Sequence, residues 1–302
     1  MLKEQSWEYP GKQGIGCNVV SPDDTTNFLL FLRQLRNTTT GRSLILSAAV
    51  YILPFADSSG SPSTDVSGFA EVLDYIAIMN YDLKSNPSFG VGPSSPMDDS
   101  CAPLDAKNGS AMSSVAAWST AGIPASKLVL GVGAYGHSYT IASSVALDQA
   151  NPTILNAYPA YTPGNRKVGD RWDGRGGLDV CGAMDGPGGV YTYWGLIEEG
   201  FLRPNGSAAP GIVTRYDDCS ETVCNNILTF QDLANVGPPS YQPFAYNPTT
   251  QTYVSYEDSR SFAAKGDFIH KSGLAGFAMW EAGGDYRDTL LDSISAFAFH
   301  FA

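Results

Sequence analysis

Carboxylates stand beside aromatic residues at three places where a short apolar run of the sequence ends. Trp7-Glu8-Tyr9 lies near the start, Met79-Asn80-Tyr81-Asp82 follows the run YIAI, and Trp280-Glu281 closes the run GFAM. Aromatic rings stack on the apolar faces of pyranose rings, while carboxylates bind hydroxyl groups or move protons. The recurrence of this pairing predicts a sugar-binding site with carboxylates available for acid–base chemistry.

The elements that must position these residues form an alternating pattern. Apolar runs of strand length cover residues 43–50, 75–81, 127–131 and 276–280. Helical patterns cover residues 21–37, 67–75, 112–122, 259–273 and 287–299. Strands that alternate with helices predict a parallel sheet with crossover helices, in which the strands are buried on both faces.

Parallel strands meet the ligand crevice at their carboxyl ends. We therefore expect the strands around Leu44, Ile76, Val129 and Phe277 to lie side by side. Their ends should bring together Glu8, Tyr81, Asp82 and Trp280.

Residues 137–252 break the alternation. The segment is rich in Gly, Pro, Asn and Tyr, and it contains short strand-like pieces such as GGVYTYW. A loop of this length is improbable inside a compact domain. We expect an inserted α+β subdomain that forms one wall of a cleft and adds aromatics such as Tyr191 or Trp194 to its packing or rim.

Composition excludes several classes of protein. The chain has 302 residues, 43% hydrophobic and 16% charged, which is enough for a large core in one large domain or two modest ones. Its net charge of −12 argues against nucleic acid and anionic membranes as partners. No apolar run is long enough to span a membrane, and no signal peptide is visible.

The cysteines and the glycosylation sequons indicate whether the protein is secreted. Cys219 and Cys224, two of five cysteines, bracket a short acidic loop that a disulfide could close or leave open. No histidine lies near a cysteine in the sequence, so no metal site is expected. Sequons at Asn37, Asn108 and Asn205 favour a secreted protein. The three histidines are interpreted as structural or surface residues: His137, His270 and His300.

Four stretches, WEYPG, IMNYD, LVLGVGAYG and GFAMWEAGGD, resemble in this order the strand-end motifs of glycoside hydrolase family 18. That family comprises chitinases and their lectin-like relatives. The resemblance implies an α/β fold of the (β/α)8 TIM-barrel type, with residues 1–302 as one catalytic domain that contains the insertion. It also implies an extracellular protein that acts on chitin or chitooligosaccharides, polymers of β-1,4-linked N-acetylglucosamine, without a cofactor.

The resemblance also implies roles in a retaining, substrate-assisted mechanism. Glu8 would be the general acid, Tyr81 would hold the acetamido group of the substrate, and Asp82 would contact the sugar and the acid. Met79 would line the pocket and Trp280 would form its floor. The rim candidates are Tyr9, Tyr135 and Glu281.

From the residues alone, plainer roles stay open for these positions. Glu8 fits a surface carboxylate and Met79 fits core filler. Tyr81 and Asp82 fit an ordinary strand end with its turn, and Trp280 fits simple packing.

The start of the chain departs from the family motif D-x-x-D-x-D-x-E. The corresponding positions hold Met1, Glu4 and Ser6 before Glu8. The motif belongs to the fourth strand of the barrel, so barrel strands one to three and most of strand four are expected to be missing. Ser6 cannot supply the charge that orients the acetamido group, and the resemblance thus implies impaired hydrolysis.

Two alternatives stay open: a non-catalytic oligosaccharide binder, and a chain that does not fold stably alone.

Overall fold

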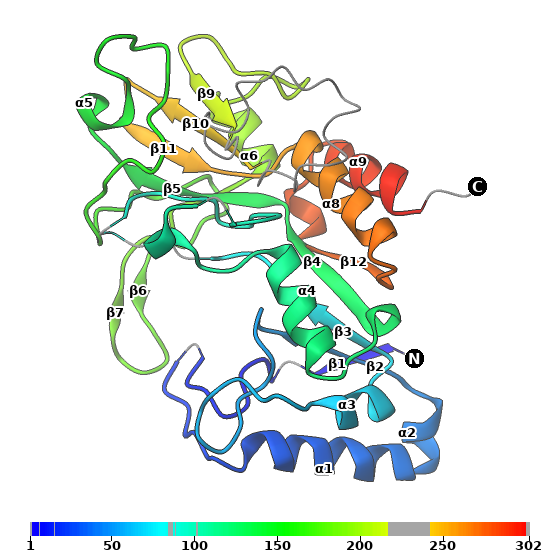
Figure 1. Cartoon of the computed structure of the whole chain (residues 1–302). Helices are drawn as coiled ribbons and strands as arrows, with labels where there is room; N and C mark the ends of the chain where they lie inside the picture. Colours follow the sequence, from blue (N-terminus) through cyan, green and yellow to red (C-terminus); the bar gives the residue numbers. More distant parts are fainter. Residues whose placement is uncertain are drawn as a thin grey trace.

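A five-stranded parallel sheet forms the lower half of the molecule in Figure 1. The computed structural model describes residues 2–5, 7–14, 16–83, 87, 89–100, 102–216 and 242–299. The strands, in their order in the sheet, are β1 (Leu2–Gln5), β2 (Ile45–Val50), β3 (Tyr75–Ile78), β4 (Leu128–Gly133) and β12 (Gly276–Trp280). The parallel neighbours β2, β3, β4 and β12 confirm the predicted side-by-side arrangement.

Two expectations about this sheet are corrected. β1 pairs with β2 in parallel, directly before Trp7, so a four-residue strand occupies the place where most of a strand was expected to be missing. Burial on both faces holds for most of β4 but is wrong at the starts of β2 and β3, where Leu46 and Ile76 are fully buried whereas Ile45 and Tyr75 are exposed. The reason is that helices cover the face that carries Leu46 and Ile76, and the opposite face lacks such a layer (Figure 1).

The predicted helices are present with small shifts of their ends: α1 (Asp24–Asn37), α3 (Ser67–Val72), α4 (Ala111–Thr120), α8 (Ser259–Lys271) and α9 (Thr289–Ala298). The structure adds elements that were not predicted: the short helix α2 (Thr39–Ser43) and the 3-10 turns η1 (Leu104–Ala106), η2 (Ala125–Lys127) and η4 (Ala282–Gly284). Phe28 and Leu32 of α1 pack in the core against the sheet, as their helical spacing predicts. Ser21 does not cap α1; its backbone N–H instead donates to the carboxylate of Asp24.

A second, antiparallel sheet lies between β4 and β12 in the sequence. β4 continues after Ala134 into β5 (Tyr135–Thr140). The sheet has the order β8 (Val190–Thr192), β5, β11 (Thr252–Ser255), β10 (Pro243–Asn247) and β9 (Val213–Tyr216), with α5 (Ser143–Ala146) and α6 (Tyr193–Glu198) beside it. Its division from the parallel sheet into an inserted subdomain stays a prediction.

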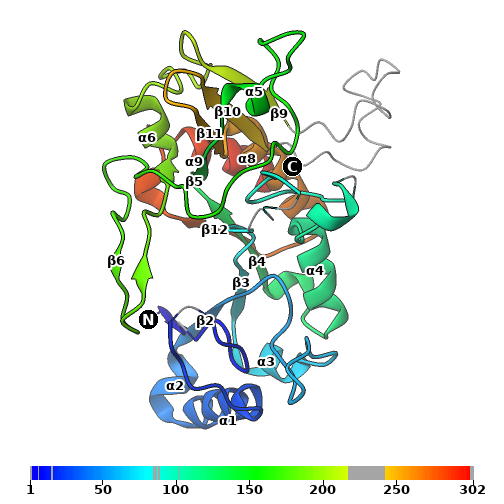
Figure 2. The ribbon, with the colours of Figure 1, turned by 90° about the vertical axis from the view of Figure 1, so that its left-hand side faces the viewer.

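A small hairpin leaves this sheet and reaches toward the N-terminal loops, as Figures 1 and 2 show. It consists of β6 (Gly177–Leu178) and β7 (Met184–Asp185). A disulfide joins Cys181 at its tip to Cys17, with the two Cα atoms 5.7 Å apart. No pattern in the sequence singled out this pair. The Cys219–Cys224 bridge, which the sequence leaves open, lies outside the described residues. None of the helices in the described ranges is long and apolar enough to cross a membrane.

Asp74 ties the first helix to the sheet and makes a stability test possible. Its carboxylate accepts hydrogen bonds from Arg36 Nη2 at 2.6 Å and from the Leu46 N–H at 2.8 Å. Burial raises the pKa of Asp74, but these hydrogen bonds and the Arg36 charge outweigh burial and leave the pKa below its ordinary value. Because the folded pKa is lowered, the contribution is full above about pH 4 and is lost as the pH falls further.

We expect the unfolding free energy of Asp74→Asn to depend less on pH than that of the wild type between about pH 5 and pH 2, because asparagine cannot release a proton. Urea titrations at stepped pH measure both dependences. Parallel curves for the two proteins would contradict the lowered pKa.

Candidate active site

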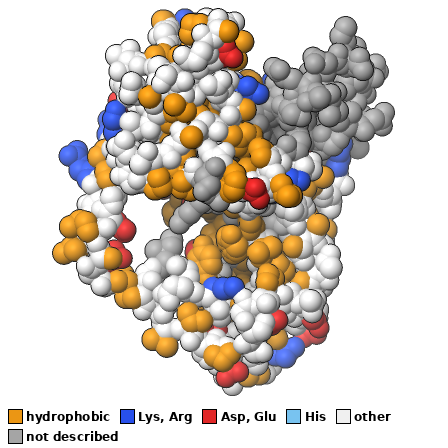
Figure 3. Space-filling view, turned by 60° about the vertical axis from the view of Figure 1, so that its left-hand side comes forward, with side chains coloured by type: hydrophobic (Ala, Val, Ile, Leu, Met, Phe, Trp, Pro, Cys, Tyr) orange, Lys and Arg blue, Asp and Glu red, His pale blue; other side chains and the backbone are white. Residues whose placement is uncertain are grey.

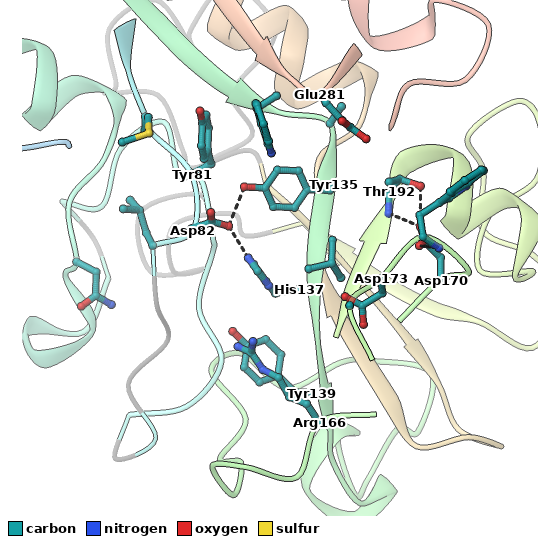
Figure 4. A pocket seen from close by; sticks show the side chains of 18 of the residues that line it. Tyr81, Asp82, Tyr135, His137, Tyr139, Arg166, Asp170, Asp173, Thr192 and Glu281 are labelled. Carbon is teal, nitrogen blue, oxygen red and sulfur yellow. Dashed lines mark hydrogen bonds and ion pairs between the residues drawn. The ribbon is translucent and has the colours of Figure 1, made fainter. Parts of the chain in front are cut away.

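A cavity of about 770 Å³ lies where the carboxyl ends of the parallel strands meet the antiparallel sheet. Seven residues singled out in the sequence line it: Tyr9, Met79, Tyr81, Asp82, Tyr135, Trp280 and Glu281 (Figure 4). Glu8, the expected acid, does not belong to the lining; it follows β1 and is partly exposed. The structure thus brings most of the predicted residues together, while their roles stay predictions.

The end of β3 positions Tyr81 and Asp82. β3 stops at Ile78, and Asp82 adopts the left-handed backbone conformation with φ 57°, which turns the chain at the cavity. Gly131 of β4 leaves room for the Tyr81 ring, because a Cβ at Gly131 would lie 3.0 Å from a ring carbon. The sequence therefore supplies a small residue where the tyrosine approaches the neighbouring strand.

The Asp82 carboxylate is held by two side chains of β5. Its Oδ1 accepts a hydrogen bond from the Tyr135 hydroxyl at 2.7 Å and lies 2.7 Å from His137 Nε2 (Figure 4). A carboxylate can only accept, so Nε2 carries the proton between the two groups. Asp82 is thereby fixed on the cavity wall from the side of the antiparallel sheet.

The interpretation of His137 as a structural or surface residue is wrong, because its side chain lines the cavity. Tyr135, His137 and Tyr139 alternate along β5 and therefore point to the same face, toward the cavity. This period of two in the stretch AYGHSYT is the signal that could have found His137 and Tyr139.

Burial shifts the ionisation of two tyrosines at the site. It raises the pKa of Tyr135 far above its ordinary value, and the charge of Asp82 and its hydrogen bond act in the same direction. Burial, followed by the charges of Glu8 and Asp82, raises the pKa of Tyr9. Both phenols therefore stay protonated at neutral pH and can donate hydrogen bonds or stack, but they cannot act as bases.

The wall opposite β3 consists of residues that sequence reasoning missed. They are Tyr139, Arg166, Asp170, Trp172, Asp173, Val190 and Thr192. Asp170 accepts hydrogen bonds from the backbone and hydroxyl of Thr192, so this acid holds the wall together (Figure 4). Trp172 is exposed and offers its ring to the cavity.

The two aromatics expected in the packing or at the rim of this wall differ in their positions. Tyr191 is buried against Phe201, between the lining residues Val190 and Thr192, as expected for packing. Trp194 lies near Arg171 outside the lining. Tyr51 and Asn108 line the cavity from the side of the parallel sheet, and Asn108 belongs to one of the three sequons.

A buried polar network supports the β3 end from behind. Ser95 Oγ donates to the Asn80 carbonyl, and Lys265 Nζ of α8 donates to Ser95 Oγ at 2.7 Å. Lys265 also pairs with Glu257 at 2.8 Å, and both side chains are almost wholly buried. Burial raises the pKa of Glu257 and lowers that of Lys265, and the charge of each partner opposes the shift of the other. Each buried charge is therefore stabilised by its partner. The network fixes the backbone beside Tyr81 and Asp82.

Within the described ranges, the structure contains no cluster of three or more His, Cys, Asp or Glu side chains that could hold a metal ion. Asp82 lies against His137, and Asp170 and Asp173 accept hydrogen bonds from backbone N–H groups. The arrangement offers a cavity lined by two exposed tryptophans, Trp280 and Trp172, and by the fixed carboxylate of Asp82.

Comparison with known proteins agrees with this description. The family model of glycosyl hydrolases family 18 matches residues 5–285. A chitinase-like effector of Moniliophthora roreri is 45% identical over 96% of this chain and 65% of its own length. Its counterpart in Moniliophthora perniciosa is 42% identical over 95% of this chain and 60% of its own length. The chain thus spans less than two thirds of these relatives.

A solved structure extends the comparison to the fold. The chitinase from Rhizomucor miehei superposes with a TM-score of 0.79 at 28% identity, over 98% of this chain and 73% of that enzyme. The fold is therefore of the (β/α)8 TIM-barrel type, to which the five parallel strands contribute. Together, the strand-end residues, the sheet and the family match show that the chain belongs to glycosyl hydrolase family 18.

Proposed function

We propose that this chain binds chitooligosaccharides in the cavity between the two sheets and hydrolyses them poorly or not at all. The observation that carries the proposal is the lining: aromatic rings of Tyr81, Tyr135 and Trp280 surround the fixed carboxylate of Asp82. A volume of about 770 Å³ suits a ligand of several sugar rings. Family membership and the resemblance to chitinases support N-acetylglucosamine as the sugar.

Each lining residue has a proposed task in binding. Trp280 would stack on a sugar ring as the floor, and Tyr81 would donate to an acetamido group. Asp82 is held in place by β5 side chains, and its carboxylate would accept a hydrogen bond from a sugar hydroxyl. Met79 would contribute apolar contact.

One observation favours binding over hydrolysis. Ser6 stands where the family motif has an aspartate, so the charge that orients the nucleophilic acetamido group is absent. Glu8 keeps the motif position of the acid, and its charge acts on the cavity residue Tyr9. Impaired hydrolysis, with binding retained, is the function that the replacement of this aspartate supports.

We propose an extracellular location. The Cys17–Cys181 disulfide fits an oxidising compartment, and the three sequons fit the same route.

Chitin pull-down combined with analysis of released sugars tests the proposal. We expect the chain to be retained on chitin without release of soluble oligosaccharides. Ser6→Asp should raise release because it restores one positioning carboxylate, and adding Glu8→Gln to that variant should remove the gain because the acid is lost.

Release at the level of the Rhizomucor miehei chitinase, assayed in parallel, would contradict the impaired hydrolysis. Failure of the chain to be retained on chitin would contradict the proposed ligand.

A further inference from the structure

We propose that residues 174–188, the strap, make the cavity accessible to a sugar chain only end first, because the Cys17–Cys181 disulfide closes the strap over the cavity. The inference rests on the proposed function and concerns how its ligand enters. The strap contains β6 and β7, with Cys181 at the turn between them.

The base of the strap is fixed to the antiparallel side of the cavity. The Gly188 N–H donates to the Gly174 carbonyl at 3.0 Å, which closes the base. Asp173 accepts from the N–H groups of Gly169 and Gly189 at 2.7 and 2.8 Å, and Arg166 donates to the Gly188 carbonyl at 3.0 Å. Since Arg166 and Asp173 line the cavity, the strap starts at the cavity wall.

The tip of the strap is shaped to present its cysteine. Asp179 Oδ1 accepts from the N–H groups of Cys181 and Ala183, both at 2.8 Å. Gly182 has a φ of 78°, which allows the tight turn. Leu178 and Met184 are exposed on the two strands, so little packing holds the strap against the rest of the protein. The disulfide is therefore its main tie to the opposite wall.

The partner cysteine belongs to that opposite wall. Cys17 lies in the loop that follows Tyr9, and both Tyr9 and Gly14 of this segment line the cavity. Trp172 and Gly174, at the base of the strap, line it from the other side. The disulfide thus joins the two walls covalently, across residues 164 positions apart in sequence.

The strap, the disulfide and the two walls thus enclose an opening, the ring. Figure 3 shows an opening between the hairpin, at the left, and the rest of the molecule, with apolar side chains in the hollow beside it. An oligosaccharide that contacts Gly14 on one wall and Trp172 and Gly174 on the other is expected to run inside this ring. A free chain end can pass through, whereas the interior of a chain with blocked ends cannot enter without opening the ring.

Binding of chitohexaose with free ends and of chitohexaose carrying a small folded protein at each end tests the proposal. The oxidised wild type should bind the free sugar and show no detectable binding of the doubly blocked sugar. Cys17→Ser/Cys181→Ser should bind both with similar affinity, because the ring is open.

A second variant opens the ring in another way, in case Cys17→Ser/Cys181→Ser does not fold. In this variant, two glycines replace residues 175–187 and connect Gly174 to Gly188. The backbones of these two residues are already hydrogen-bonded, so a short turn can join them. This variant loses the strap but none of the residues that line the cavity. It should also bind both sugars. If the oxidised wild type bound the blocked sugar as tightly as the free sugar, end-first entry would be wrong, but the proposed function would stand. Lack of binding of the free sugar by all three proteins would overturn the proposed function itself.

Discussion

Lys265→Met is expected to lower the free energy of unfolding by about 3–5 kcal/mol, the usual cost of removing one partner of a buried ion pair. Lys265 and Glu257 are 0% and 1% exposed, and their charged atoms are 2.8 Å apart. Methionine keeps much of the volume but leaves the Glu257 carboxylate without a cation. It also removes the donor to Ser95 Oγ. Urea unfolding followed by circular dichroism measures the loss.

The same helix offers a matched control. Lys271 and Asp267 of α8 also lie 2.8 Å apart, but they are 69% and 46% exposed. Because exposed pairs contribute only about 0–1 kcal/mol, Lys271→Met should change stability little. If Lys265→Met and Lys271→Met lowered the free energy of unfolding by the same amount, burial would not determine how much an ion pair contributes to stability.

The pH dependence of the Lys265→Met variant follows from the remaining carboxylate. Burial raises the pKa of Glu257, and loss of the lysine removes the main opposing influence. The folded pKa then lies above the unfolded one, so the deficit of the variant should grow as the pH rises above about 4. Adding Glu257→Leu should restore stability and remove this dependence, because apolar replacements of buried pairs are often neutral.

Trp280→Ala is expected to weaken chitohexaose binding by about 2 kcal/mol, or about 30-fold in the dissociation constant. Trp280 closes β12, is 61% exposed and lines the cavity, so its ring is free to stack on a sugar. Removing an aromatic anchor forfeits its contact area and admits water. Isothermal titration calorimetry with the oxidised protein measures the change.

Two further tryptophans calibrate this result. Trp172→Ala should weaken binding of the hexamer, because Trp172 is also exposed and lines the cavity. Trp194→Ala should leave binding unchanged, because Trp194 is partly exposed but lies outside the lining. Unchanged affinity in Trp280→Ala, with a native melting temperature, would exclude this ring as the floor of the site.

Local patterns sufficed for the strands β2, β3, β4 and β12 of the parallel sheet, though not for β1, and for most of the residues at the strand ends. The run GFAMW predicts β12 over residues 276–280, and the structure places the strand at these residues. Tyr81, Asp82 and Trp280 meet at one cavity because parallel strands end at one edge, which requires no long-range information beyond the alternation.

Other parts of the site depend on contacts that no local pattern carries. Trp172 reaches the cavity because neighbouring acids, Asp170 and Asp173, anchor its loop to residues up to 22 positions away. The Cys17–Cys181 pair spans 164 positions, and five cysteines allow many pairings. His137 is different: its alternation with Tyr135 was visible in the sequence, but a strand that continues beyond the parallel sheet was not expected there.

The position of Asn108 affects the choice of expression host. Asn108 lines the cavity and begins the sequon Asn-Gly-Ser. A eukaryotic host that glycosylated this asparagine in the secretory pathway would attach a glycan whose first two sugars are β-1,4-linked N-acetylglucosamine. Those sugars would be tethered at the mouth of a cavity proposed to bind the same disaccharide unit. Protein from a bacterial host without this modification is therefore the material in which the ligand affinity of the bare cavity can be measured.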